Sequence, residues 1–358
     1  GISNYTTFAS ASALRDTGRV HGLDDRSLSC TKYIPKERGQ SLPLNEAAEQ
    51  VPELAAFKEA HPDLWAHATR LEGSMRSLGQ HAAGMVIAGE PLVNRAVVQT
   101  RGAPVVNWDK RAVEDWGLVK MDILGLSTLD ILEMAKSYVR ERHGVEIDYT
   151  AIPLDDPDVL KAFGQGDSVG VFQFESSGMR KLLKDLARLN PLNFEDITAA
   201  TALYRPGPMD SGLLDDFVSI KQGFKEPYYE HPNMEDALKE TQGVIVYQEQ
   251  VMQVARDLAG FSMSEADTLR KAMGKKDKEK MAKMREKWVQ GCITHAGMNE
   301  RQAGELFDKI EAFAGYGFNK SHATAYSVIS YWSMWLKVRY PAEFYAAALS
   351  VMKEEKLE

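Results

Sequence analysis

The segment Gly117–Thr128, GLVKMDILGLST, places one lysine and one aspartate inside an otherwise apolar run. Its apolar residues are typical of a buried strand. A carboxylate does not suit such a strand, because burying it without a partner is costly. The residues alone leave two roles open for Asp122. It is either a structural residue that caps a turn or pairs with Lys120, or it binds a metal.

Length and charge bound the possible functions. A chain of 358 residues can bury a sizeable core and is long enough for two or three domains. The net charge of −8 excludes a protein that binds nucleic acid through a generally basic surface, so any contact with a polyanion has to be local. Cys30 and Cys292 have neither metal spacing nor a pairing pattern, which suits a reducing cytoplasm.

No segment indicates a membrane or secretory location. The N-terminus lacks a basic region followed by an apolar one, which a signal peptide requires. The most apolar run, Ala323–Leu336, has about 14 residues, whereas a bilayer-spanning helix needs about 20. We therefore predict a cytoplasmic protein with no membrane partner. The first residue is Gly1 rather than methionine, so we interpret the chain as part of a longer one.

Hydrophobic periodicity predicts an α+β fold that is mostly helical. Short amphipathic patterns predict a helical subdomain from about Arg15 to Leu78, and strand-length runs predict a small sheet within Gly79–Gly125. An amphipathic helix is expected over Leu126–His143, and the chain after it is mostly helical. The expected exceptions are two further strands, Ser168–Ser176 and Gly243–Gln250.

One segment of this acidic chain, LRKAMGKKDKEKMAKMREK, is strongly basic. From Arg270 to Lys287 it holds nine lysines and arginines against three acidic residues. Such a patch suits a triphosphate or a nucleic-acid backbone. The Lys/Glu alternation after Asp277 also suits a solvated helix face with i,i+4 ion pairs. The better ligand candidates precede the alternation or follow an expected turn at Gly274, and they are Arg270, Lys271, Lys275 and Lys276.

The segment AGYGFNKSHATAY joins a polar cluster to a strongly apolar helix. Two glycines flank Tyr316, and Asn319, Lys320 and His322 follow directly before the apolar residues. Backbone amides, a lysine and a histidine at a helix N-terminus make a potential anion site. The alternative is structural, with Asn319 or Ser321 as the helix cap and His322 as a residue of the first turn.

Two further segments carry polar residues whose roles stay open. In ALYRPGPMDSG, two prolines around Gly207 rigidify a loop that presents Arg205 either to a ligand or to an acidic partner within a structural turn. In RSLGQHAAGMVIA, His81 lies among small residues before a strand, where a histidine is more often structural than a ligand. The sequence contains no Walker A motif, no HExxH motif and no cysteine-rich zinc pattern.

Six segments follow one another along the chain: GLVKMDILGL, GVFQFES, ALYRPGPM, GVIVYQEQVMQ, LRKAMGKK and FAGYGFNKSHATAY. In this order and spacing they resemble the bacterial DNA polymerase III α subunits, the family C DNA polymerases. The resemblance covers essentially the whole chain. It implies a nucleotidyltransferase palm related to polymerase β, an inserted helical thumb and a large helical fingers domain. The implied boundaries are 1–14 for the end of the first palm piece, 15–77 for the thumb, 78–127 for the second palm piece and 128–358 for the fingers.

The resemblance also implies a reaction, the attack of a primer 3′-OH on the α-phosphate of a dNTP. Two Mg²⁺ ions about 3.5–4 Å apart stabilise the attacking and leaving oxygens. Asp122 matches the third of three metal-binding carboxylates, and Lys120 points from the same strand face towards that site. The implied partners are primer–template DNA, a sliding clamp and other replisome subunits. The residues that match nucleotide-binding positions are Arg205, Arg270, Lys271, Lys275, Lys276, Tyr316, Asn319, Lys320 and His322.

One part of the family pattern is missing from these 358 residues. The other two metal carboxylates belong to a PDxDxDF motif, which is expected to precede Gly1, as is a Gly-Ser-rich phosphate loop. A single carboxylate does not form a two-metal site, so we expect the chain alone not to extend a primer. The main alternative is a catalytically inactive relative that binds DNA or a partner. A nucleotidyltransferase for RNA or small molecules is less consistent with the GYGFNKSHATAY and LRKAMGKK segments.

Overall fold

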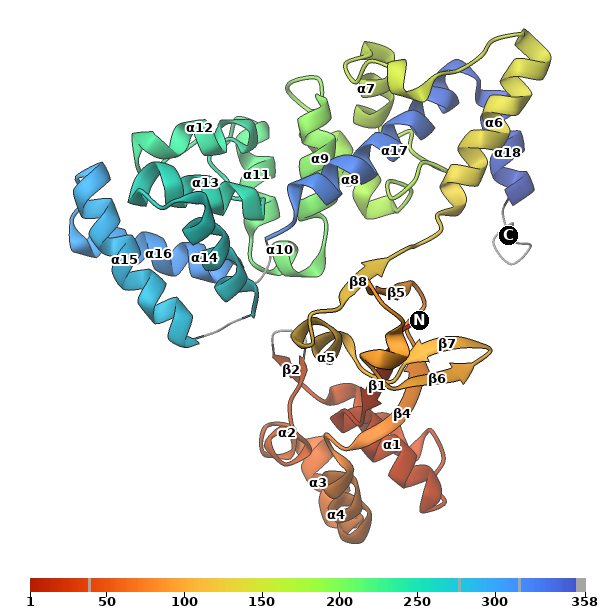
Figure 1. Cartoon of the computed structure of the whole chain (residues 1–358), viewed down its shortest axis with the longest axis vertical. Coiled ribbons are helices and arrows are strands. Elements are labelled where there is room, and N and C mark those ends of the chain that lie inside the picture. Colours follow the sequence, from red (N-terminus) through yellow and green to blue (C-terminus); the bar gives the residue numbers. More distant parts are fainter. Residues whose placement is uncertain (38–39, 276–277, 315–316, 352–358) are drawn as a thin grey trace. The chain divides into compact units, whose positions relative to one another are not determined.

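The computed structural model describes residues 1–37, 40–275, 278–314 and 317–351 (Figure 1). Helices dominate the described part, and its strands are short. The predicted class, α+β with a mostly helical chain, is confirmed. Two of the predicted nucleotide-binding residues, Lys276 and Tyr316, lie outside the described residues.

The first of two compact units, Gly1–Gly125, contains a group of short helices. Their bounds are Ser10–Val20 for α1, Ser27–Tyr33 for the 3₁₀-helix η1, Leu44–Gln50 for α2, Pro52–Ala60 for α3 and Pro62–Leu71 for α4. Proline begins α3 and α4, at a position where its missing N–H costs no hydrogen bond. Leu14, Leu44 and Trp65 are buried in one apolar cluster that joins these helices. The predicted helical subdomain is therefore confirmed as far as Leu71.

Helix α4 ends earlier than the predicted limit of Leu78. Gly73 adopts a φ of 75°, in the left-handed region that favours glycine, and the chain then enters strand β4, Met75–Gln80. β4 pairs with β1, Ser3–Thr7, a strand that the sequence pattern did not predict. Most residues of both strands are exposed, so neither strand carries an alternating apolar pattern.

The other strands of this unit form three further antiparallel pairs. The pairs are β2 (Lys36–Glu37) with β3 (Gln40–Ser41), β5 (Gly84–Ile87) with β8 (Val119–Asp122), and β6 (Val98–Arg101) with β7 (Ala103–Val106). The 3₁₀-helix η2, Leu92–Asn94, and helix α5, Lys110–Asp115, lie between them in the sequence. The prediction of one sheet is wrong, because each strand pairs with one other among those described. A parallel bridge joins Ile2 to Val106, and both side chains are buried in one cluster.

The second unit, Leu126–Glu358, is helical in its described part. Its α-helices are α6 (Ser127–His143), α7 (Pro157–Gly164), α8 (Ser177–Leu186), α9 (Phe194–Leu203), α10 (Pro206–Asp210), α11 (Leu213–Lys221), α12 (Glu235–Leu238), α13 (Gln248–Ala259), α14 (Met263–Lys275), α15 (Lys278–Ala296), α16 (Glu300–Ala314), α17 (Lys320–Arg339) and α18 (Pro341–Val351). Its 3₁₀-helices are η3 (Tyr149–Ala151), η4 (Pro232–Met234) and η5 (Lys239–Thr241). The helix predicted up to His143 is confirmed as α6, which buries Leu132, Ala135 and Val139.

The two strands predicted in the second unit are wrong. Residues 168–176 form turns, in which Ser168 Oγ donates to the Phe174 carbonyl at 2.7 Å. Residues 243–247 form a loop that enters α13, with one parallel bridge between Tyr247 and Phe318. Short apolar runs of this length occur in buried turns as well as in strands, so their pattern does not separate the two.

Buried aromatic residues organise the core of the second unit. Tyr331 of α17 is fully buried, and its ring centroid lies 6.4 Å from that of Phe163. In a second cluster, Trp288 of α15 is fully buried and donates its indole N–H to the Ala303 carbonyl at 3.0 Å. The first contact joins α17 to α7, and the second joins α15 to α16. Among the described helices, none combines the length and apolar character needed to cross a membrane.

Candidate active-site and nucleotide-binding residues

Asp122 is the last residue of β8 and lies opposite Gly84 of β5. Its side chain is 56% exposed. Val119 and Met121 of the same strand are also exposed, whereas Leu118 before the strand is buried. The expectation of a carboxylate inside a buried strand is therefore wrong. Within the described part, β8 has β5 as its only strand neighbour, and its side chains keep contact with solvent.

Lys120 lies on the same face of β8 as Asp122, as predicted from the alternation of side chains along a strand. Its side chain is 8% exposed, and its ammonium group forms an ion pair with Oδ1 of Asp122. The hydrogen bond from Lys120 holds the pKa of the Asp122 carboxyl below its ordinary value. The carboxylate is therefore ionised at neutral pH, and the structural alternative, pairing with Lys120, is observed.

His81 stabilises the turn that leads into β5. Its Nδ1 accepts hydrogen bonds from the N–H groups of Ala83 and Gly84, at 3.2 and 2.8 Å. The N–H of Ile123 in turn donates to the Ala83 carbonyl at 2.9 Å, which ties this turn to the residue after Asp122. The predicted structural role of His81 is thus confirmed for one of its two ring nitrogens.

Asp122 supplies one carboxylate of the kind that binds Mg²⁺, whose preferred protein ligands are oxygens. Its exposure leaves the group accessible to an ion. In the part of the chain with described positions, no three His, Cys, Asp or Glu side chains come together as a metal site. The chemistry of Asp122 fits a metal ligand, and a complete two-metal site needs further carboxylates.

Helix α17 begins with a network of hydrogen bonds around Asn319. Its Oδ1 accepts from the N–H of His322 at 2.8 Å, so Asn319 is the N-cap and His322 belongs to the first turn. This structural alternative is confirmed. Asn319 Nδ2 and the N–H of Lys320 donate to the two oxygens of Glu249, at 2.6 and 2.9 Å. A carboxylate of the protein therefore occupies the helix N-terminus, where negative charge is stabilised.

Aromatic rings connect His322 and Arg205 to the same end of α17. The His322 ring centroid lies 5.4 Å from that of Phe318 and 4.2 Å from that of Tyr326. The Arg205 guanidinium lies 4.3 Å from the Phe318 ring centroid, within cation–π distance, and its Nε donates to the Ala202 carbonyl at 2.9 Å. Burial lowers the pKa of Arg205, but an arginine stays protonated at neutral pH.

Arg270 and Lys271 share one carboxylate. Nε and Nη2 of Arg270 donate to Asp267 Oδ1 at 3.0 and 2.7 Å, and Lys271 Nζ lies 2.7 Å from Oδ2. Hydrogen bonds from Lys271 and then Arg270 hold the pKa of Asp267 below its ordinary value. Arg270 Nη1 also reaches Oε1 of Gln248 at 3.5 Å, and Gln248 Nε2 donates to the Gly317 carbonyl at 3.2 Å. Both basic residues therefore make the helical ion pairs of the alternative interpretation.

Two further predicted lysines lie at helix ends. Lys320 Nζ lies 2.7 Å from Oε2 of Glu240 and 5.7 Å from the Tyr247 ring centroid. Lys275 is the last residue of α14, and its side chain lies outside the described part. The expected turn at Gly274 is wrong, because α14 continues through that residue.

The predicted residues of the second unit are thus linked through one region. Contacts run from Arg270 through Gln248 to Gly317, and Phe318 next to it carries the guanidinium of Arg205. Sequence reasoning missed the acidic partners, namely Glu240, Glu249 and Asp267. Glu249 lies in the GVIVYQEQVMQ segment, yet its partner Asn319 is 70 residues away, so no local spacing indicates the contact.

Comparisons with known proteins identify the family. Residues 1–125 match the model of the bacterial DNA polymerase III alpha NTPase domain, and residues 128–296 match the model of the bacterial DNA polymerase III alpha subunit finger domain. The chain belongs to the DNA polymerase III α subunit family. The border between its two compact units, after Gly125, falls between the two matched regions.

Several relatives named DNA polymerase III subunit alpha align with nearly the whole chain. The relative from Yersinia pestis is 44% identical over 99% of this chain and 35% of its own length. Those from Thermus aquaticus and Aquifex aeolicus are 45% and 46% identical, over 99% and 87% of this chain and 29% and 26% of their own lengths. The chain therefore spans about a third of the length of the polymerase III α subunits that it matches.

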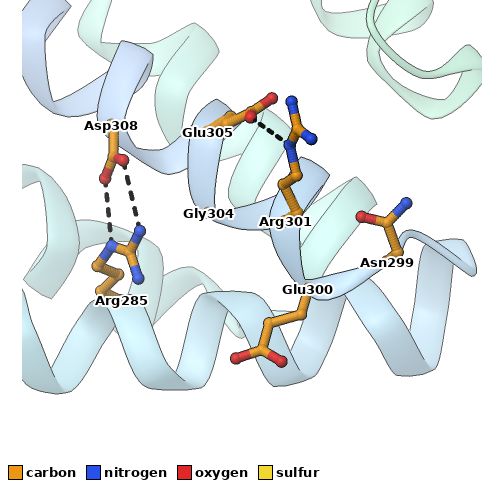
Figure 2. Close-up of a pocket in the computed structure, with 7 residues that line it drawn as sticks. All are labelled: Arg285, Asn299, Glu300, Arg301, Gly304, Glu305 and Asp308. Carbon is orange, nitrogen blue, oxygen red and sulfur yellow. Dashed lines mark hydrogen bonds and ion pairs between the residues drawn. The ribbon is translucent and has the colours of Figure 1, made fainter.

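Figure 2 shows a surface hollow in this family member that contains none of the predicted nucleotide-binding residues. It lies between α15 and α16 and is lined by Arg285, Asn299, Glu300, Arg301, Gly304, Glu305 and Asp308. Arg285 donates to both oxygens of Asp308, at 3.2 and 3.4 Å, and Arg301 donates to Glu305 at 2.8 Å. These ion pairs compensate one another's charge, so the hollow offers no net attraction for an anion.

Proposed function

We propose that this chain is part of a template-directed DNA polymerase that adds dNTPs to a primer 3′-OH by two-metal phosphoryl transfer. The observation that carries the proposal is the exposed, ionised Asp122 at the end of β8, within the region that matches the polymerase III family. The proposed arrangement has palm pieces at 1–14 and 78–127, a thumb at 15–77 and fingers at 128–358.

Asp122 and Lys120 have different roles in this proposal. Asp122 holds Mg²⁺ together with further carboxylates, and the ions stabilise the attacking and leaving oxygens of an in-line displacement. Lys120 keeps the Asp122 carboxylate ionised and restricts its orientation through the ion pair. Because the Lys120 side chain is almost fully buried, it holds that orientation more firmly than an exposed lysine does.

The cluster around α17 binds the incoming nucleotide in this proposal. Arg205, Arg270, Lys271 and Lys320 supply positive charge for the triphosphate, and Asn319 supplies the helix cap beside it. Lys275, Lys276, Tyr316 and His322 are proposed members of the same set. Arg270, Lys271 and Lys320 exchange their present carboxylate partners for phosphate oxygens, so binding replaces one set of ion pairs with another.

The remaining substrates and partners follow from the activity of the family. Primer–template DNA is the proposed second substrate, and a sliding clamp and other replisome subunits are proposed partners of the complete protein, in the cytoplasm. The relatives are named as subunits of DNA polymerase III, which supports an assembly of this kind.

The runner-up is a catalytically inactive polymerase relative that binds DNA. The observation that favours it is the single carboxylate, because the described residues contain no group of three metal-binding side chains. In either case we expect residues 1–358 alone not to extend a primer with Mg²⁺ and dNTPs. Clear extension by this chain would contradict that expectation.

The experiment that separates the two functions uses the complete natural protein that carries these residues. Asp122→Asn keeps the shape of the side chain and removes its charge, and we expect primer extension to fall by about 10²–10³-fold while DNA binding is retained. Asp115→Asn, an exposed residue at the end of α5, is the matched control and should leave extension unchanged. Retained extension in the Asp122 variant rules out the proposed metal role.

A further inference from the structure

His81 lies on the face of the β5–β8 pair that carries Asp122 and Lys120. Gly84 is paired directly with Asp122, and cross-strand partners present their side chains to the same face. A Cβ atom on Gly84 would lie 3.0 Å from His81 Nδ1 and 2.5 Å from Cγ2 of Ile2. The imidazole ring therefore fills the space next to Asp122 that a side chain at Gly84 would otherwise occupy.

The hydrogen bonds of His81 determine which ring nitrogen carries the proton. Nδ1 accepts from two backbone N–H groups, those of Ala83 and Gly84, and an accepting nitrogen carries no hydrogen. In the neutral ring the proton is then on Nε2, which becomes a donor. Nε2 makes no hydrogen bond to the residues that the structure describes, and His81 is only partly buried.

We propose that Nε2–H of His81 donates a hydrogen bond to a phosphate oxygen bound beside Asp122. The ligand class is a phosphate ester or polyphosphate, because its negatively charged oxygens suit the donors of His81 and Lys120 that border the Asp122 carboxylate. The proposal rests on the proposed polymerase function and adds a phosphate-binding residue to it. His81 then has two separable roles, Nδ1 in shaping the turn and Nε2 in binding the ligand.

Three substitutions separate these roles. In His81→Asn the amide oxygen is near the place of Nδ1, so the turn is kept and the donor at Nε2 is lost. In His81→Gln the longer side chain places its amide N–H near Nε2, so the donor is kept and the acceptor of the turn is lost. His81→Ala removes both.

The kinetic test uses primer extension by the complete natural protein. For His81→Asn we expect KM for the dNTP to rise by about tenfold, the scale of one lost hydrogen bond to a charged group, with an unchanged melting temperature. His81→Gln should show the reverse pattern, and His81→Ala should show both defects. If His81→Asn leaves KM unchanged while Asp122→Asn abolishes extension, the inference about His81 is wrong and the proposed function stands. If Asp122→Asn retains extension, the proposed metal role of Asp122 fails, and the inference about a phosphate beside it fails with it.

A second measurement does not depend on activity. In the 358-residue chain labelled with ¹⁵N-histidine, the His81 signals are those that disappear in His81→Asn, and their two-bond correlations report the tautomer. We expect the Nε2–H form, and we expect these signals to shift saturably on addition of magnesium tripolyphosphate. An Nδ1–H form, or His81 signals that do not move during the titration, would overturn the proposal.

Discussion

Strand β8, which ends at Asp122, and the N-terminus of α17 both contain candidate site residues. The two regions differ in how many protein groups bind their carboxylate. Asp122 is more than half exposed, and among the described residues its carboxylate pairs with the buried Lys120. At α17, Asn319 and Lys320 both contact the carboxylate of Glu249. The carboxylate of the first region is accessible to solvent, whereas that of the second region accepts hydrogen bonds from the start of a helix.

Under the proposed function, this difference affects how each region binds its ligand. An outward carboxylate can take up a cation without losing a partner, since Lys120 holds only one of its oxygens. Under the proposed function, the donors at α17 and the cations on α14 give up Glu249, Glu240 or Asp267 when they bind phosphate. Binding of the proposed ligand at the second region is then an exchange of internal carboxylates for phosphate oxygens.

In this comparison, we expect the largest loss of primer extension when the partner of the Asp122 carboxylate is removed. Lys120→Met keeps the buried stem and removes the ammonium group that orients Asp122, so primer extension by the complete protein should fall by about 10–100-fold. Lys309→Met is the control, because Lys309 is exposed, pairs with Glu230 and is not part of the proposed site. Equal rates in the two variants would show that Lys120 does not orient the carboxylate.

A smaller effect, on dNTP binding, is expected when one cation of the proposed nucleotide-binding residues is removed. Arg270→Ala should weaken dNTP binding by about tenfold, as expected for one lost hydrogen bond to a charged group. Arg285→Ala is the matched control, because Arg285 pairs with Asp308 in the hollow of Figure 2 and lies outside the proposed site. Titration calorimetry with a dNTP measures both, and equal affinities would remove Arg270 from the proposed site.

The hydrogen bonds between Asn319, Glu249 and His322 can be tested by protein stability, without a ligand. Asn319→Ala removes the acceptor for the His322 N–H and one donor to Glu249, so the free energy of unfolding should fall by about 1 kcal/mol or slightly more. Asp109→Ala removes the corresponding cap of α5 in the first unit. Among the described residues Asp109 makes no hydrogen bond to a second helix, so this substitution should cost less. Urea unfolding followed by circular dichroism compares the two, and a larger loss for Asp109 would contradict the network.

The smallest expected effect is a pH dependence at Asp267. Lys271 and Arg270 lower its pKa in the folded protein, so their stabilisation is present above the ordinary aspartate value of about 3.9 and is lost as the pH falls through the lower folded value. The melting temperatures of the wild type and Asp267→Asn should therefore differ above about pH 5 and converge in stronger acid. A difference that persists unchanged in strong acid would exclude the ion pairs as its cause.

Sequence reasoning predicted much of the second unit, because long amphipathic patterns such as that of α6 record which face is buried. It gave a cap at Asn319 or Ser321 as one of two alternatives for the start of α17, since asparagine before an apolar helix is a local signal. It failed for β1 and β4, whose exposed residues carry no alternation, and for residues 168–176, whose apolar pattern suits a buried turn equally well. Among the candidate residues, it placed Lys120 and Asp122 on one face but misjudged their burial.

Local sequence patterns indicated the family, the helical character of the second unit and the residue types able to bind a metal or a triphosphate. Three features became evident only from the folded chain: Asp122 faces solvent, Glu249 occupies the N-terminus of α17 and His81 lies beside Asp122. The reason is physical. Helical periodicity and capping depend on residues three or four positions apart, which the sequence shows directly. Exposure and ion pairing depend on which segments, far apart in the sequence, come into contact in the folded chain. The contact between Glu249 and Asn319, for example, spans 70 residues.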